Sequence, residues 1–87
     1  MLRVETLQEG NRTVLRLIGE LRSGEIGILQ SEISEDSVTV VVNLKELSVI
    51  DLNGIRFLLE CRARGIEIEE CPPYVREWMK RESEGRR

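Results

Sequence analysis

The feature that most constrains the fold is an apolar segment that leads through a polar turn into an amphipathic helix. Residues 38–44 are almost continuously apolar and β-branched, which is typical of a central strand covered on both faces. An Asp-Leu-Asn-Gly turn follows at residues 51–54, and the helix that begins there ends at Gly65. The apolar stripe of this helix consists of Leu52, Ile55, Leu58 and Leu59. Residues 66–69 alternate in polarity, so the three elements predict a right-handed βαβ crossover.

The residues before this unit predict a β-hairpin and a short helix. Leu2, Val4 and Thr6 alternate with charged residues, a turn follows at residues 9–11, and residues 13–18 are again typical of a strand. Ser23 is placed to cap the short helix, and Gly27 is expected to make it irregular. The apolar face of this helix is expected to contain Ile26, Leu29 and Ile33.

The residues after the crossover predict a last helix that begins near Pro73, because proline is favoured in a first helical turn. Val75, Trp78 and Met79 recur at helical spacing and form its apolar stripe. We therefore interpret Trp78 as a core side chain, although an aromatic can also serve for docking.

The composition is that of one small globular domain. The chain has 87 residues, of which 40% are hydrophobic and 33% charged, and its net charge is −3. With three aromatics and no basic excess, it offers no surface for a nucleic acid. No apolar run approaches the roughly 20 residues needed to span a bilayer, and residues 1–5 lack a signal-peptide pattern. We expect a cytoplasmic protein without direct membrane insertion.

The absence of histidine removes the commonest general base and the commonest zinc ligand. We therefore expect no enzymatic activity, no cofactor and no metal site. Glu67, Glu69 and Glu70 offer carboxylates, but the solvent face of a strand explains the first two and no other ligand completes a set. Cys61 and Cys71 are expected to be free thiols in a reducing compartment.

Residues 43–55 read N-L-K-E-L-S-V-I-D-L-N-G-I. They resemble, without a gap, the D-L-S-G-V-x-F-I-D-S-S-G-L signature of the STAS domain, the fold of bacterial anti-sigma factor antagonists and of sulfate transporter tails. The residues that match outright are Leu44, Ile50, Asp51 and Gly54. Leu52 and Asn53 stand where the signature has its two serines.

Two weaker similarities extend this resemblance over residues 4–80. Gly-Glu-Leu at residues 19–21 resembles the end of the family's second strand, and residues 71–79 resemble its third helix. The resemblance implies an α/β fold with a small mixed sheet of about four strands and about three helices mainly on one face. We assign residues 1–80 to a single STAS-like domain and residues 81–87 to a charged, frayed C-terminal tail.

The resemblance implies a partner-binding surface at the turn of residues 50–56 and the helix that follows. The partner-binding residues that it implies are Asp51, Leu52, Asn53, Gly54 and Arg56. A purely structural interpretation also fits the turn: Asp51 or Asn53 caps the helix, and Gly54 allows a close approach of the backbone.

The resemblance also implies a change in regulation. In the family, a kinase phosphorylates the second serine of the signature, and the added charge switches binding off. Asn53 occupies this column and cannot accept phosphate, so we expect no phosphorylation switch at the turn. Ser48 is the nearest hydroxyl, and we interpret it as a loop residue between strand and helix.

Three functions stay open at this point. The first is a non-catalytic module that resembles an anti-sigma factor antagonist and binds an anti-sigma factor or a switch-kinase-like ATPase. The second is a STAS subunit that regulates an ABC-type lipid-transport ATPase. The third is a small nucleotide- or anion-binding domain, because a helix N-terminus attracts anions, although no glycine-rich phosphate loop supports it. Self-association into a homo-oligomer is compatible with each of them.

Overall fold

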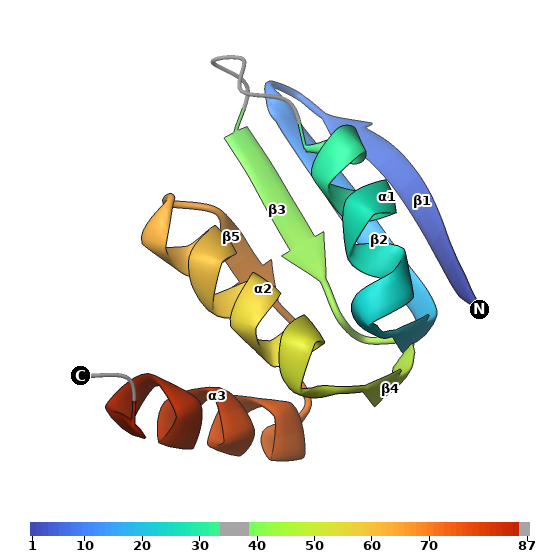
Figure 1. The fold of residues 1–87 in the computed structure, drawn as a ribbon. Coiled ribbons are helices and arrows are strands. Elements are labelled where there is room, and N and C mark those ends of the chain that lie inside the picture. Colours follow the sequence, from blue (N-terminus) through green and yellow to red (C-terminus); the bar gives the residue numbers. More distant parts are fainter. Residues whose placement is uncertain (34–38, 86–87) are drawn as a thin grey trace.

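The computed structural model describes residues 1–33 and 39–85 and has one mixed sheet with helices packed against it (Figure 1). The strands are β1 (Leu2–Glu9), β2 (Arg12–Leu21), β3 (Thr39–Asn43), β4 (Leu47–Ile50) and β5 (Glu67–Glu69). The helices are the 3₁₀ turn η1 (Ser23–Glu25), α1 (Ile26–Glu32), α2 (Leu52–Ala63) and α3 (Pro73–Gly85). The fold is therefore α/β, as the sequence predicted.

The sheet has five strands, in the order β1-β2-β3-β5, with β4 beside the end of β2. β1 and β2 form the predicted antiparallel hairpin. β2 is parallel to β3 along its first half and to β4 along its last three residues, and β3 is parallel to β5. The pairs Leu15↔Val42 and Val42↔Ile68 give the register across the centre. β3, α2 and β5 thus form the expected crossover.

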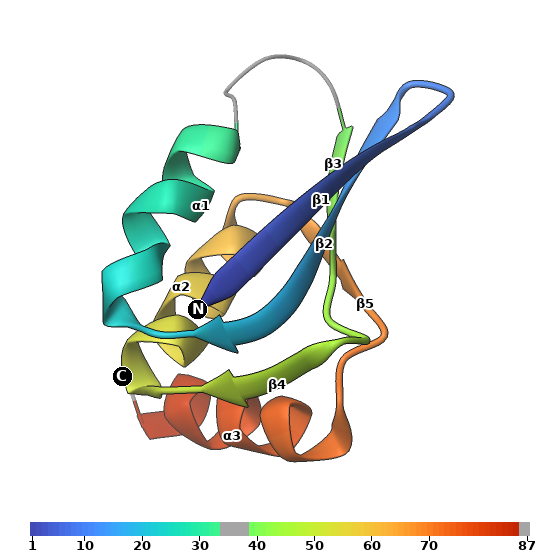
Figure 2. The ribbon, with the colours of Figure 1, turned by 90° about the vertical axis from the view of Figure 1, so that its right-hand side faces the viewer.

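The helices α1 and α2 lie on one face of the sheet, and α3 lies beside α2 and beneath β4 (Figures 1 and 2). The hydrophobic core fills the space between the sheet and these helices. Its fully buried side chains include Leu15, Leu17, Leu29, Val42, Ile55, Leu58, Val75 and Met79. Trp78 packs against this core and is partly buried.

The opposite face of the sheet is covered by charged side chains rather than by a helix. Val14 and Val41 lie side by side there and are only 4% and 0% exposed. Arg16 forms ion pairs with Glu5 and Glu46 on the same face. The aliphatic stem of an arginine can cover apolar surface, which is consistent with the burial of two valines on a face that carries ion pairs. β3 is covered on both faces as expected, but helices cover only one.

β4 is the strand that the sequence analysis missed, since we expected about four strands and a loop at residue 48. β4 has only four residues, and its register with β2 shifts between Gly19 and Glu20. The Ser48 hydroxyl donates a hydrogen bond to the Gly19 carbonyl oxygen at 2.8 Å, so Ser48 belongs to the sheet. A strand this short has no periodicity that sequence can reveal.

Two further details of the helices differ from expectation. Leu52 does not join the buried stripe of α2, because its side chain is 38% exposed, whereas Phe57 and Cys61 are buried. α3 extends to Gly85, so residues 81–85 of the expected tail are helical. Val38 of the expected strand and residues 86–87 of the expected tail lie outside the described residues.

Gly54 is a position where only glycine fits. A Cβ atom there would lie 2.8 Å from the Leu21 carbonyl oxygen and 2.7 Å from Ile50 Cγ1. We predict that Gly54→Val lowers the free energy of unfolding by about 1–3 kcal/mol, because the backbone of β2 must shift. Urea unfolding measures this loss, and an unchanged midpoint would contradict the close approach.

Gly27 in α1 provides the matched control. A Cβ atom there would have no neighbouring heavy atom within 4 Å. We expect Gly27→Ala to raise the free energy of unfolding by about 0.5–1 kcal/mol, because alanine loses less backbone entropy on folding.

Candidate functional site

The candidate site is the turn of residues 50–56, which joins β4 to α2. Its position is set by the end of β2: Ile50 pairs with Leu21, and the Asp51 N–H donates to the Leu21 carbonyl oxygen at 3.2 Å. The buried Gly54 brings the first turn of α2 against the same carbonyl group. The start of α2 is therefore attached to the sheet rather than to a flexible loop.

The Asp51 carboxylate caps α2 and also reaches the next segment of the fold. Its Oδ1 accepts the Gly54 N–H at 2.9 Å, which is the N-cap bond expected for this residue. Its Oδ2 accepts the Ser23 N–H at 3.0 Å and the Ser23 hydroxyl at 3.2 Å. One carboxylate thus ties the start of α2 to the start of η1.

These contacts lower the pKa of Asp51 below its ordinary value. Desolvation by burial acts to raise the pKa, but the hydrogen bonds from Gly54 and Ser23 outweigh it, and Arg22 adds a favourable charge. The carboxylate is therefore ionised near neutral pH. An anion that approached this end of α2 would meet a negative charge already in place, which disfavours the nucleotide- or anion-binding alternative at this turn.

Asn53 completes a three-residue network. Its Nδ2 donates to the Ser23 Oγ at 2.6 Å, so the Ser23 hydroxyl accepts from Asn53 while it donates to Asp51. Our expectation that Ser23 caps its own helix is wrong, because Arg22 holds the N-cap position of η1. Ser23 lies 28 residues before Asp51 in the chain, and no local sequence signal joins the two.

The five residues predicted for partner binding differ in what they offer a partner. Leu52, Asn53 and Arg56 are exposed, and the Arg56 Nε donates to the Glu82 Oε2 at 2.8 Å. Asp51 is half-buried, and its carboxylate oxygens already accept hydrogen bonds within the chain. Gly54 is buried, so a partner cannot contact it. The exposed part of the turn is therefore Leu52, Asn53 and Arg56.

Two exposed apolar side chains that the sequence analysis did not single out border the turn. Val49 is 37% exposed and Tyr74 is 51% exposed. The Tyr74 hydroxyl lies 3.5 Å from the Ser48 carbonyl oxygen, which places α3 next to the end of β4. We call these two side chains and Leu52 the apolar edge of the turn. They stand at solvent-exposed positions, which carry no sequence signal.

A groove between α1 and α2 adjoins the turn. We call it the α1–α2 groove, and its lining residues are Ser23, Ile26, Gly27, Gln30, Asn53, Arg56, Phe57 and Glu60. Its apolar, amide and charged side chains suit a protein surface.

Within residues 1–33 and 39–85, no three cysteine, aspartate or glutamate side chains come together as a metal ligand set. In the same residues, no helix is both long enough and apolar enough to cross a membrane.

The Asp51 contacts generate a prediction for stability. Asp51→Ala should lower the free energy of unfolding near neutral pH by about 1–2 kcal/mol, because the cap and the Ser23 bonds are lost. Since the folded-state pKa is depressed, this stabilisation is complete above the ordinary pKa of 3.8 and disappears as the pH falls through the lower folded value. Urea unfolding of both proteins at neutral and acidic pH measures the difference.

Asp51→Asn is the matched control for the charge. Asparagine keeps one oxygen acceptor for the Gly54 N–H. Near neutral pH, Asp51→Asn should therefore lower the free energy of unfolding less than Asp51→Ala does. If the difference in the free energy of unfolding between wild type and Asp51→Ala is the same at both pH values, the charge of the Asp51 carboxylate contributes nothing to stability.

No family model matches the sequence, and no curated protein sequence matches it. Similar folds do occur among solved structures. A crystal structure of Mglu is 30% identical over 79% of this chain, with a TM-score of 0.63, and this chain spans only 19% of the Mglu chain.

Two other solved structures are similar over most of both chains. The anti-sigma factor antagonist SpoIIAA in its unphosphorylated form is 22% identical over 92% of this chain and 82% of its own, with a TM-score of 0.60. The antisigma-factor antagonist STAS domain from Rhodobacter sphaeroides is 16% identical over 77% of this chain and 82% of its own, with a TM-score of 0.59. At these identities the likeness identifies the fold, and this chain has the fold of a STAS domain.

Proposed function

We propose that this chain is a non-catalytic protein-interaction module that binds a protein partner through the turn of residues 50–56 and the α1–α2 groove. The observation that carries the proposal is the hydrogen-bond network of Asp51, Ser23 and Asn53. It holds the turn in one conformation while Leu52 and Asn53 stay exposed. A preorganised surface loses little conformational entropy on binding, which favours tight recognition.

The side chains around the turn support a protein as the partner. Leu52, Val49 and Tyr74 supply an exposed apolar edge, and Arg56 supplies a charge beside it. Apolar anchors with polar neighbours are typical of protein–protein interfaces. The likeness to anti-sigma factor antagonists supports an anti-sigma factor or a switch-kinase-like ATPase as the partner.

The partner can be identified by photo-crosslinking. A benzoylphenylalanine at position 52 should capture the partner in cells that express the chain, and mass spectrometry should identify it. An anti-sigma factor or kinase-like ATPase supports the leading proposal, whereas an ABC ATPase supports the transport-subunit alternative. A control crosslinker at Asn11, in the hairpin turn, should not capture the same protein.

Asn53→Asp tests whether the turn is the interface. The new carboxylate must be desolvated against the partner, so affinity should fall by roughly 30-fold or more. The fold should lose little stability, because a carboxylate in the first turn of a helix gains about 0.3–1 kcal/mol from the dipole. This gain opposes the lost bond to Ser23 and the repulsion from the Asp51 carboxylate. A titration with the purified partner and a thermal unfolding curve measure the two effects.

Asn11→Asp is the matched control, since it makes the same chemical change in the exposed β1–β2 turn. It should bind the partner as wild type does. Equal affinity of wild type and Asn53→Asp would place the interface elsewhere and leave the turn as a helix cap only.

We further propose that the turn is not regulated by phosphorylation, because neither Leu52 nor Asn53 has a hydroxyl. Incubation with a switch kinase and ATP should leave the intact mass unchanged. A stoichiometric phosphate mapped to Ser48 or Ser23, the hydroxyls nearest the turn, would overturn this proposal. Alanine variants at these two positions provide the control for the mapping.

A further inference from the structure

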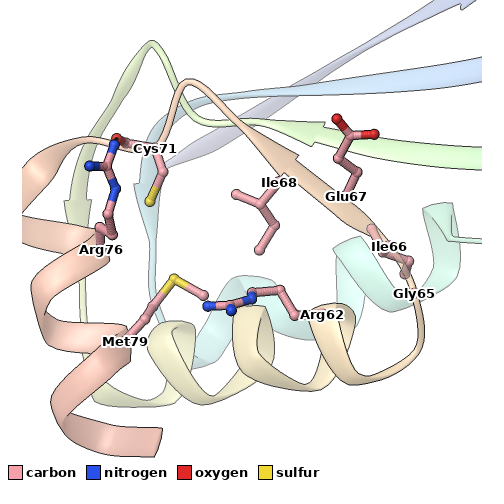
Figure 3. Close-up of a pocket in the computed structure, with 8 residues that line it drawn as sticks. All are labelled: Arg62, Gly65, Ile66, Glu67, Ile68, Cys71, Arg76 and Met79. Carbon is pink, nitrogen blue, oxygen red and sulfur yellow. Dashed lines mark hydrogen bonds between the residues drawn. The ribbon is translucent and has the colours of Figure 1, made fainter.

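A second hollow lies at the opposite end of α2 from the turn. It is formed by the last turn of α2, the strand β5 and the first half of α3 (Figure 3). Its volume is about 490 Å³, within the range of small-molecule sites. Leu52 and Arg62 are ten residues apart on α2, so roughly 15 Å of helix separates the two sites.

The inner surface of this hollow is apolar. Ile66 is 9% exposed and Met79 only 2%, and the half-buried Ile68 points from β5 into the space between them (Figure 3). Cys71 adds a partly buried thiol. Burial raises the pKa of Cys71, so this thiol is neutral near neutral pH and extends the apolar lining.

Two arginines, Arg62 and Arg76, line the hollow, and neither has a carboxylate partner among the described residues. Within residues 1–33 and 39–85, Arg12, Arg16 and Arg56 form ion pairs, whereas Arg62 and Arg76 form none. The Arg76 Nη2 donates only a long bond of 3.4 Å to the Cys71 carbonyl oxygen. Both side chains line the same hollow, and their positive charges oppose the effect of burial on the pKa of Cys71.

The carboxylates of β5 do not neutralise these arginines. Glu67 lines the hollow but points away from its interior (Figure 3). Glu69 shares that side of the sheet, where its Oε1 accepts from the Asn43 Nδ2 at 3.1 Å and its Oε2 pairs with Arg12 at 3.6 Å. The hollow thus combines an apolar floor with two positive charges that have no negative partner on it.

We propose that this hollow binds a small amphipathic anion, an acid group attached to an apolar chain. The acid group would be held between Arg62 and Arg76, since guanidinium groups form paired hydrogen bonds with such oxyanions. The chain would lie against Ile68 and Met79. The C-terminal end of α2 repels an anion through its dipole, so binding requires both arginines.

The experiment is an NMR titration of the ¹⁵N-labelled chain with sodium hexanoate. The amide signals of Ile68, Cys71 and Arg76 should shift together and give a dissociation constant on the order of 1 mM, as expected for an acid of this size. Hexan-1-ol, which has the same chain without the charge, and acetate, which has the charge without the chain, should each bind at least about tenfold more weakly. Equal binding of hexan-1-ol, or no shift at these residues, would overturn the proposal.

The double variant Arg62→Gln/Arg76→Gln should bind hexanoate at least about tenfold more weakly than wild type. Arg81→Gln is the matched control, because Arg81 is exposed on α3 and does not line the hollow. Hexanoate affinity that is unchanged in the double variant would overturn the role of the arginines. The comparison of hexanoate with hexan-1-ol on the wild-type chain tests the charge without any variant.

The reaction of Cys71 with a thiol reagent gives an independent readout. Hexanoate should slow the modification of Cys71 by 5,5′-dithiobis(2-nitrobenzoic acid), because the bound chain covers the thiol. Cys61 is buried, and its pKa is raised to about 11, so it should not react at a comparable rate. The Cys71→Ser variant identifies which part of the reaction comes from Cys71. If hexanoate does not change the modification rate of Cys71, binding in this hollow is contradicted.

Discussion

The close approach of α2 to the end of β2 is the contact on which the rest of the structure depends. Gly54 lies against the Leu21 carbonyl group, and that same carbonyl accepts the N–H of Asp51. A side chain at position 54 would push α2 away from the sheet and separate Ile55 and Leu58 from the core. The packing of the helix layer and the position of the turn therefore share one cause, which is the absence of a side chain at a single residue.

Asp51 extends this arrangement from the sheet to the neighbouring helix. Its two oxygens accept hydrogen bonds from Gly54 and from Ser23, which belong to segments far apart in the chain. The carboxylate replaces water as the partner of these N–H groups, which is why its pKa is depressed and why the turn is ordered near neutral pH. Leu52 and Asn53 remain exposed beside these contacts.

α2 joins two sites of different character. Its N-terminal end carries a satisfied carboxylate beside exposed apolar and amide groups, which suits a protein surface. Its C-terminal end carries Arg62, which complements the helix dipole and faces an apolar hollow. The two sites lie at opposite ends of one helix. A ligand in the hollow and a partner at the turn would therefore both contact α2.

The sequence by itself determined the parts of the fold that depend on neighbouring residues. The hairpin, the βαβ crossover and the glycines at positions 54 and 65 follow from periodicity and backbone freedom within a few residues. The sequence offered Asp51 or Asn53 as the cap of α2, and the structure assigns it to Asp51. The tertiary structure alone decided that residues 47–50 pair as a strand, that Ser23 bonds to Asp51, and that Arg62 and Arg76 line one hollow. Each of these joins residues that are distant in sequence, and only the packing of the whole chain brings them together.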